Sequence, residues 1–295
     1  MDINFELYKI FYITAKAGSF SEGARQLYIS QSAVSQAIGN LEEKMGSKLF
    51  IRKTRSIKLT REGEILRKHV EQAYNFLKTA EGKILEMQNL SLGEIRIGVG
   101  DTNCRFFLIP YIKEFIKMYP KIKFKIVNRT SPQIVEVLKN GQIDFGLVTL
   151  PVNDPGITIR EFKEVEDVFV ASNRFADLKN REITTTGLSR LPLLLLQQDS
   201  STRRNLDMTF NQLEVQVTPE IELESVELLV EFARIGLGVA HVLKESAAML
   251  IESGELFTIR TQEAFATRKL GLAAMKDMPL SQAASEFLKL LTSQV

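Results

Sequence analysis

Two short helical patterns separated by almost no linker constrain the fold of this chain more than any other feature. The first begins at Ser19, three residues before Glu22, so that the hydroxyl and the carboxylate can cap each other's backbone N–H groups. The second begins at Ser30, another favourable N-cap residue. Only Tyr28 and Ile29 form the turn, and two helices joined so closely must cross steeply. The spacing predicts a helix-turn-helix.

The second of these helices is apolar on one face and carries small polar residues on the other. Its apolar residues recur at helical spacing, at Val34, Ile38, Leu41 and Met45. The polar face suits insertion into a DNA major groove, because glutamine can pair with adenine and serine can reach several base edges. The residues predicted to read bases are Gln31, Ser32, Ser35 and Gln36. An ordinary exposed helical face is the alternative interpretation.

A basic segment follows. Residues 48–61 contain six Lys or Arg and no acidic residue, and 49–51 and 57–59 read as two short strands around a turn. A basic wing of this kind beside a recognition helix is placed to hold phosphates. The predicted backbone contacts are Arg52, Lys53 and Arg55, with Lys44 and Lys48 as further candidates. A solvated basic hairpin is the alternative.

These motifs resemble the winged helix-turn-helix of LysR-type transcriptional regulators. The resemblance is dense over about the first 65 residues, and it rests mainly on Gly18–Ser21, Ser30–Gln36, Leu41-Glu42 and Leu49-Phe50. Gly23 departs from the family's usual alanine and should weaken its helix by up to ~1 kcal/mol. The resemblance implies double-stranded operator DNA and RNA polymerase as partners. It also implies a homodimer that commonly assembles into a tetramer.

The charge distribution agrees with a DNA-binding head on a near-neutral body. Of the 38 Lys/Arg and 36 Asp/Glu in the chain, nine and five fall in residues 1–60, so the basic excess is local. The first residues lack the basic and apolar regions of a signal peptide, and no run of about 18 apolar residues occurs. A single cysteine, Cys104, cannot form an internal disulfide. We therefore expect a cytoplasmic protein that does not span a membrane.

A long helical pattern follows Thr60, a candidate N-cap, and runs to about Asn89. One apolar seam is maintained throughout, at Leu66, Val70, Ala73, Leu77, Ala80, Ile84 and Met87. A lone helix with one such seam needs a partner, which favours dimerisation through residues 61–89. Packing of the helix on its own domain is the alternative. In the family, this helix pairs two subunits and so sets the spacing of two recognition helices.

From Glu94 onwards, strands alternate with helices, an order that implies parallel sheets covered by helices. The predicted strands are 94–99, 123–128, 145–148, 167–171, 193–196, 220–223, 238–242 and 269–274. The predicted helices are 105–119, 132–140, 203–213, 226–234 and 280–291. The family resemblance implies an effector domain over 92–295 made of two α/β subdomains similar to type 2 periplasmic binding proteins. With crossings placed near 162–166 and 266–269, subdomain I covers about 92–162 plus 267–295, and subdomain II about 163–266.

Ligands of such sheets bind at the carboxyl ends of strands, where helix N-termini and small polar residues converge. This rule predicts an effector site made of Asp101, Thr102, Asn103, Ser131, Thr149, Ser200, Ser201 and Thr202. Helix capping alone is the alternative role for such residues, and roughly half of them are expected to do no more. Asp101 leaves the ligand open: it would repel an anionic effector unless Arg105, Arg129 or Arg203 offsets it, and it could instead favour an amine.

An enzyme is the competing hypothesis, and the sequence offers little for it. His69 falls beside the seam of the long helix, and His241 falls in a buried-looking strand where a core histidine is expected. No nucleophile elbow, phosphate loop or paired metal-ligand spacing occurs, so no cofactor or metal is expected. The predicted function is a DNA-binding transcription regulator controlled by a small molecule. A regulator that needs no effector, or that senses thiol oxidation at Cys104, is the alternative.

Overall fold

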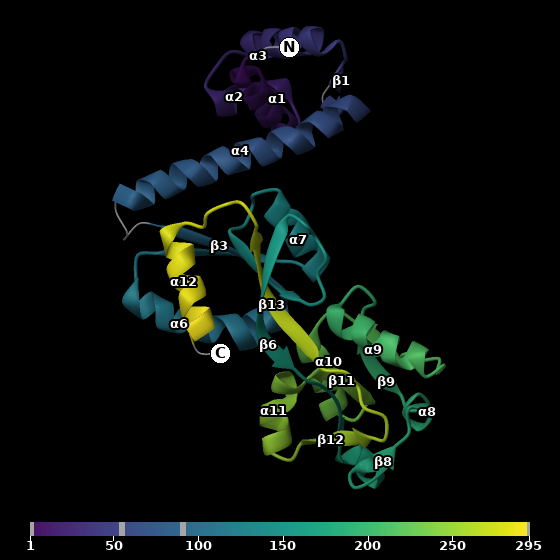
Figure 1. The fold of residues 1–295 in the computed structure, drawn as a ribbon. Coiled ribbons are helices and arrows are strands. Elements are labelled where there is room, and N and C mark those ends of the chain that lie inside the picture. The colour runs from purple at the N-terminus through teal and green to yellow at the C-terminus, as the bar shows by residue number, and fades with distance from the viewer. Residues whose placement is uncertain (1–2, 53–56, 89–92, 294–295) are drawn as a thin grey trace. The chain divides into compact units, whose positions relative to one another are not determined.

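The computed structural model describes residues 3–52, 57–88 and 93–293 and divides into two compact units, Met1–Leu85 and Glu86–Val295 (Figure 1). The first unit contains the predicted three-helix head, a two-stranded wing and most of a long helix. Its elements are α1 (Phe5–Ala17), α2 (Phe20–Leu27), α3 (Gln31–Met45), β1 (Phe50–Arg52), β2 (Ile57–Leu59) and α4 (Arg61–Gln88).

Caps define the turn between α2 and α3. The Ser19 hydroxyl accepts a hydrogen bond from the Glu22 backbone N–H at 3.1 Å, as predicted. The reciprocal half of the predicted capping box is wrong, because the Glu22 carboxylate accepts hydrogen bonds from Arg25 and Gln26 instead. Tyr28 then ends α2 in the left-handed conformation, with φ 57° and ψ 36°.

Close packing of α1 on α2 explains the unusual glycine in α2. A Cβ on Gly23 would lie 2.9 Å from Thr14 Oγ1 and 3.0 Å from Thr14 Cα, and Thr14 is fully buried. Glycine is less favourable than alanine within a helix, but here it allows the two backbones to approach. The two helices and α3 enclose a core around Phe11, whose ring lies 5.4 Å from that of Phe50 in the wing.

The apolar seam of α4 has two roles along its length. In the first part of the helix, Val70 is buried and Leu66 packs against the core of the same unit. This part of the seam therefore packs on its own domain, which was the alternative to dimerisation. Further along, Leu77 and Ile84 are exposed. Thr60 begins the helix as expected, since its hydroxyl accepts from the Gly63 backbone N–H at 3.0 Å.

The second unit contains two sheets, each with helices packed on it. The first sheet has the order β4-β3-β5-β13-β6, made of β4 (Lys123–Asn128), β3 (Glu94–Val99), β5 (Phe145–Thr149), β13 (Arg268–Met275) and β6 (Ile157–Val165). The second has the order β10-β9-β11-β7-β12-β8, made of β10 (Ile221–Leu223), β9 (Leu193–Leu196), β11 (Val239–Leu243), β7 (Asp167–Ser172), β12 (Leu256–Thr261) and β8 (Glu182–Ile183).

The helices of this unit lie between the strands along the chain, and the last one follows β13. They are α5 (Asp101–Asn103), a π-helical turn (Cys104–Leu108), α6 (Ile109–Met118), α7 (Ser131–Lys139), a 3-10 helix (Asn173–Leu178), α8 (Thr185–Leu188), α9 (Ser201–Gln212), α10 (Val226–Arg234), α11 (Lys244–Glu252) and α12 (Gln282–Ser293). The predicted helix at 105–119 thus starts four residues earlier and contains a π turn. Pro110 lies just after that turn and cannot donate a backbone hydrogen bond, which disfavours regular α-helical pairing there.

The parallel pairing predicted from the first three strands of this unit is confirmed, but the complete sheet is mixed. In the first sheet β3 runs parallel to β4 and β5, whereas β13 runs antiparallel to β5 and β6. Three elements, β6, α11 (Lys244–Glu252) and β12, were not predicted from the sequence. Of these, β6 is exposed at most positions, so its residues lack the apolar run of a central strand.

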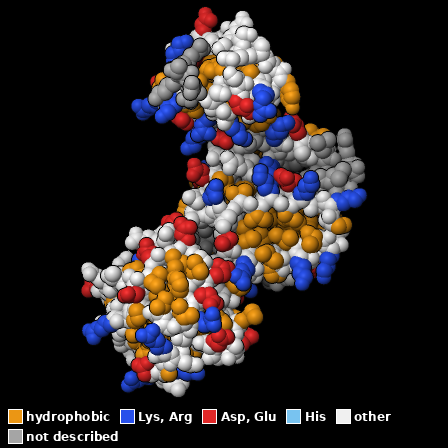
Figure 2. Space-filling model, turned by 180° about the vertical axis from the view of Figure 1, so that it is seen from behind, with side chains coloured by type: hydrophobic (Ala, Val, Ile, Leu, Met, Phe, Trp, Pro, Cys, Tyr) orange, Lys and Arg blue, Asp and Glu red, His pale blue; other side chains and the backbone are white. Residues whose placement is uncertain are grey.

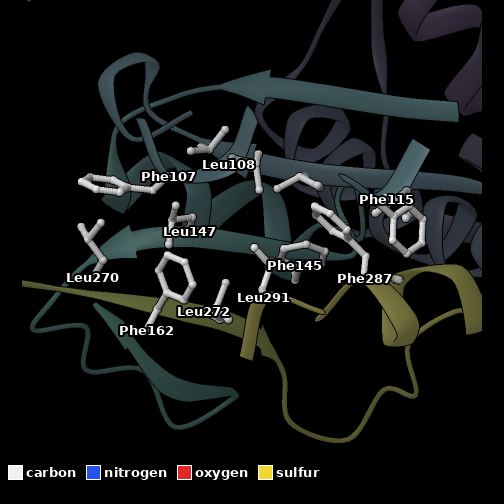
Figure 3. Close-up of a cluster of buried hydrophobic side chains, with 14 of the residues drawn as sticks. Phe107, Leu108, Phe115, Phe145, Leu147, Phe162, Leu270, Leu272, Phe287 and Leu291 are labelled. Carbon is white, nitrogen blue, oxygen red and sulfur yellow. The ribbon is translucent and has the colours of Figure 1, made fainter. Parts of the chain in front are cut away.

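The two sheets are connected by two neighbouring segments. One is the passage from β6 to β7 through Glu166, and the other leads from β12 into β13, whose first residue Arg268 pairs with Val165. The core of the first sheet includes side chains of α6 and α12 and is rich in phenylalanine (Figure 3). Phe287 of α12 is central, with its ring 5.0 Å from Phe115 and 5.2 Å from Phe124.

Candidate functional site

The N-terminal end of α3 presents the residues predicted to read bases. Ser30 caps this helix by accepting from the Ala33 backbone N–H at 3.1 Å. The face carrying Val34 and Ile38 is fully buried against the core, which turns the opposite face outwards. Among the four residues predicted to read bases, the side chains of Gln31, Ser32 and Gln36 are exposed and that of Ser35 is half-buried.

Two of these side chains are oriented by neighbours. The Ser21 hydroxyl donates to Gln31 Oε1 at 3.1 Å, and the Ser30 and Ser32 hydroxyls lie 2.8 Å apart. A glutamine that accepts through its carbonyl oxygen still has two amide hydrogens to donate. Gln31 is therefore held at the helix end with donors available, as pairing with a base edge requires.

A buried carboxylate fixes the wing to α3. Glu42 accepts hydrogen bonds from the backbone N–H groups of Leu49 and Phe50, at 2.9 and 3.3 Å, and from Lys48 Nζ at 2.7 Å. Burial by itself would raise the pKa of Glu42, but the hydrogen bonds from Lys48 and from the two backbone groups outweigh burial and lower that pKa. The wing thus starts from a defined point beside the recognition helix.

The predicted phosphate contacts are only partly described by the structure. Arg52 ends β1 and pairs across the wing with Ile57, and Lys44 is exposed at the end of α3. Lys53 and Arg55 lie outside the described residues. Lys48 has an exposed side chain whose ammonium group is held by Glu42.

Tyr28 is an exposed aromatic residue of the head. Its side chain is 96% exposed at the turn that precedes α3. A large residue with positive φ is uncommon in folded proteins, and a ring with so little packing does not stabilise the turn. The sequence signal for an exposed ring was the position of Tyr28 in a two-residue turn between two helices. So short a turn has no interior in which a side chain could be buried.

In the second unit, all eight residues predicted as an effector site line one cleft of about 500 Å³. The cleft is formed by the carboxyl ends of β3, β4 and β5, the loops after β9 and β10, and the start of β13. The predicted residues that line it are Asp101, Thr102, Asn103, Ser131, Thr149, Ser200, Ser201 and Thr202.

Several of these polar side chains have structural bonds as well. The Ser131 hydroxyl, at the start of α7, accepts from the Thr149 backbone N–H at 2.9 Å and so joins α7 to the end of β5. Ser200 caps α9 by accepting from the Arg203 backbone N–H at 3.1 Å. A hydroxyl that accepts still carries a hydrogen to donate, so both residues retain a donor at the cleft.

Of the three arginines considered as partners of an anion, only Arg129 lines the cleft. Arg203 is buried and donates to Asp207 and Glu222. Arg105 makes an ion pair with Glu227, with 2.5 Å between Nη1 and Oε1. Asp101, which also lines the cleft, accepts a hydrogen bond from the Asn128 side chain at 3.1 Å.

A second arginine at the cleft, Arg268, was missed by the sequence analysis. Its Nε and Nη2 donate to the two carboxylate oxygens of Asp167, and its Nη1 lies 3.5 Å from Thr149 Oγ1. Arg268 and Asp167 are 101 positions apart in the sequence, so no local pattern could have indicated the pair.

The remaining reactive side chains behave as packing residues. Cys104 is half-buried, and its pKa is raised by burial and, to a smaller extent, by Asp101, which disfavours the reactive thiolate. His241 is 2% exposed and its ring lies 4.5 Å from that of Phe169. Burial lowers the pKa of His241 to about 4. Among residues 3–52, 57–88 and 93–293, no group of three or more His, Cys, Asp or Glu could hold a metal ion.

No helix in the described part of the chain is both long and apolar enough to cross a membrane. The family model described as a bacterial regulatory helix-turn-helix protein of the lysR family matches residues 5–64. The model described as a LysR substrate binding domain matches residues 88–295, which is more than half of the chain.

Curated relatives and solved structures share this organisation over nearly the whole length. The transcriptional activator CmpR of Synechocystis is 26% identical over 96% of this chain and 93% of its own length. The transcriptional regulator YofA of Bacillus velezensis is 26% identical over 95% and 94%. In fold, the chain is similar to full-length CbnR in complex with its target DNA, with a TM-score of 0.70, 17% identity and coverage of 99% and 100%.

A second solved structure, HinK of Pseudomonas aeruginosa, gives a TM-score of 0.60 at 21% identity and coverage of 99% and 98%. The predicted fold class and the predicted family are thus confirmed. The winged head and the two-sheet body are the two matched domains. The chain belongs to the LysR family and is a helix-turn-helix, DNA-binding transcriptional regulator.

Proposed function

We propose that α3 reads operator DNA in a major groove through Gln31, Ser32, Ser35 and Gln36. The observation that carries this proposal is the exposed N-terminal end of α3, with its side chains oriented by Ser21 and Ser30 and clear of the core. The wing residues Arg52, Lys53 and Arg55 hold the sugar-phosphate backbone, and Tyr28 adds a contact beside the helix end. Phosphate contacts position such a head, whereas base contacts give it specificity.

The chain divides its work among three regions in this proposal. Residues 1–60 bind DNA, residues 61–89 pair two subunits, and residues 92–295 bind a small-molecule effector in the cleft. Subdomain I (92–162 plus 267–295) and subdomain II (163–266) both contribute to that cleft, so a ligand with unequal affinity for two arrangements of the subdomains shifts their populations. RNA polymerase is the proposed partner at the promoter.

Two separate apolar surfaces support a homo-oligomer larger than a dimer. One is the exposed part of the α4 seam, with Leu77 and Ile84. The other lies in the second unit, where Ile109 and Ile116 of α6 are exposed on one face of the helix. Figure 2 shows hydrophobic side chains gathered over broad areas of one face of this unit. Two surfaces on one chain allow each subunit to contact two others, as a homotetramer requires.

The DNA part of the proposal is tested by comparing two variants on selected and random duplexes. An operator is first isolated by selection from random-sequence DNA, and binding is then measured by fluorescence anisotropy over a range of salt concentrations. Gln31→Ala should weaken binding to the selected site by about 1–3 kcal/mol and leave random DNA nearly unaffected. Arg52→Ala should weaken both and reduce the salt slope by about 1. Equal losses on both duplexes for both variants would contradict this division of roles.

The effector part is tested by thermal unfolding against a panel of carboxylates, sulfur compounds, amino acids and amines. A compound present at 100 times its dissociation constant should add about 2.7 kcal/mol, a shift of a few degrees. Ser131→Ala or Thr149→Val should remove that shift. If no compound shifts the transition and DNA binding stays intact, the chain is an effector-independent regulator. Cys104→Ser then separates the thiol-sensing alternative, because that variant should be unresponsive to peroxide.

A further inference from the structure

The charges around the cleft are unevenly matched. Five charged side chains line it: the carboxylates of Asp101, Asp199 and Glu224, and the guanidinium groups of Arg129 and Arg268. The charge of Arg268 is already compensated by the buried carboxylate of Asp167. The cleft therefore has an excess of negative side-chain charge, which disfavours a ligand that carries only anionic groups.

One end of the cleft nevertheless offers a set of donors. Ser131 begins α7 and its hydroxyl retains a hydrogen to donate, whereas Pro132 has no backbone N–H and the Gln133 backbone N–H is capped by the Thr130 side chain. The Ser131 hydroxyl is held by the Thr149 backbone, and Arg268 Nη1 lies near the Thr149 hydroxyl. These donors come from the ends of the adjacent strands β5 and β13.

The strand order places the acidic group beside these donors. Asp101 follows the carboxyl end of β3 after Gly100, and its hydrogen-bond partner Asn128 ends β4. In the sheet order β4-β3-β5-β13, the Asp101 carboxylate with its partner Asn128 and the donor group thus lie at neighbouring strand ends, with about 4.8 Å for each strand spacing. An ammonium group and a carboxylate attached to one carbon can meet both groups at this separation.

We propose that the cleft binds a small zwitterion of the α-amino acid type. Its carboxylate faces the hydroxyls of Ser131 and Thr149 and the guanidinium group of Arg268, and its ammonium group faces Asp101. The side chain of the ligand then points toward the loops at Asp199 and Glu224. This inference rests on the proposed effector role of the cleft and names its ligand class.

The test uses the full-length protein and three matched sets of probes. The twenty standard amino acids are screened by thermal unfolding and isothermal titration. Each amino acid that binds is compared with its 2-hydroxy acid, which lacks the amine, and with the amine that lacks the carboxylate. Both analogues should bind at least tenfold more weakly than the amino acid, a loss of about 1.4 kcal/mol.

Variants assign the two ends of the ligand. Asp101→Asn should weaken the amino acid roughly tenfold or more and leave the 2-hydroxy acid unaffected, because only the ammonium group loses its partner. Thr149→Val should weaken both ligands. Asp277→Asn, an exposed carboxylate of the same unit that does not line the cleft, is the matched control.

Three results would overturn the zwitterion assignment. These are the absence of binding by any of the twenty amino acids at millimolar concentration, equal or tighter binding of the 2-hydroxy acid, and an unchanged amino acid affinity in Asp101→Asn. Binding of another class of metabolite that Thr149→Val abolishes would leave the effector role in place while refuting this ligand class. A chain that binds none of the compounds yet binds DNA would refute both.

Discussion

The guanidinium group of Arg268 and the carboxylate of Asp167 form a two-pronged ion pair in which the two side chains are only 5% and 3% exposed. Arg268 begins β13 and Asp167 begins β7, so the pair lies where the chain passes between the two sheets. Its position beside Thr149 also makes it part of the wall of the cleft. The ion pair of Arg268 with Asp167 thus lies both at the connection between the two sheets and at the wall of the proposed ligand site.

Breaking this pair should be strongly destabilising. Arg268→Met leaves the buried Asp167 carboxylate without its partner, and the expected loss in the free energy of unfolding is about 3–5 kcal/mol. Urea denaturation followed by circular dichroism measures it, since the chain has no tryptophan. The adjacent exposed pair of Lys269 with Glu161 is the control: Lys269→Met should cost less than about 1 kcal/mol. Equal effects of the two substitutions would show that burial does not set the strength of the Arg268 pair.

Glu42 should be required for the stability of the wing. Glu42→Ala removes the acceptor for the backbone N–H groups of Leu49 and Phe50, both buried residues, and should lower the free energy of unfolding by roughly 2–4 kcal/mol. DNA affinity should fall too, because the wing loses its attachment to α3. The neighbouring exposed Glu43 offers a matched control, and Glu43→Ala should change neither property measurably. Full DNA affinity in Glu42→Ala would argue against a role of the wing in binding.

His241 should make the chain less stable in mild acid. Its pKa is about 4 in the folded chain, below its ordinary value of 6.5, because burial outweighs the opposing effect of Asp167. As the pH falls below about 6.5 the unfolded chain binds a proton that the folded chain does not, so stability is lost down to about pH 4, by about 3 kcal/mol in total.

The substitution His241→Phe separates this effect from the titration of carboxylates. The difference in unfolding free energy between wild type and variant, measured from pH 8 to pH 4, should shift in favour of the variant as the pH falls. His69→Gln controls for removal of a histidine at an exposed site. A constant difference across this range would contradict the assignment of the acid sensitivity to His241.

Tyr28 should contribute to DNA binding and not to folding. Asparagine tolerates the left-handed conformation better than tyrosine, so Tyr28→Asn should leave the melting temperature unchanged or raised. Its affinity for DNA should fall roughly tenfold, about 1.4 kcal/mol, because the exposed ring is lost. Anisotropy and thermal unfolding on the same preparation measure both properties. A lower melting temperature with unchanged affinity would make Tyr28 a structural residue.

Local sequence patterns were sufficient for the head and for many elements of the body. Ser19, Ser30 and Thr60 mark helix starts because each supplies a side-chain acceptor to the first turn, a property of a few consecutive residues. The strands at 94–99 and 123–128 were predicted at their observed bounds, because a strand pattern is also a property of a few consecutive residues. The polar residues of the cleft were predicted together because each follows the carboxyl end of a strand, in one sheet or the other.

Only the tertiary structure could decide contacts between residues far apart in the chain. From local sequence alone Gly23 only weakens α2, whereas in the structure it allows α2 to approach Thr14 closely. The residues around Arg268 do not indicate its buried partner Asp167. The antiparallel placement of β13 between β5 and β6 likewise depends on a return of the chain after a hundred residues. Helix caps and periodicity act over a few residues and are visible in the sequence. Burial, charge compensation and strand order depend on the whole chain, and they determine which charges face the cleft.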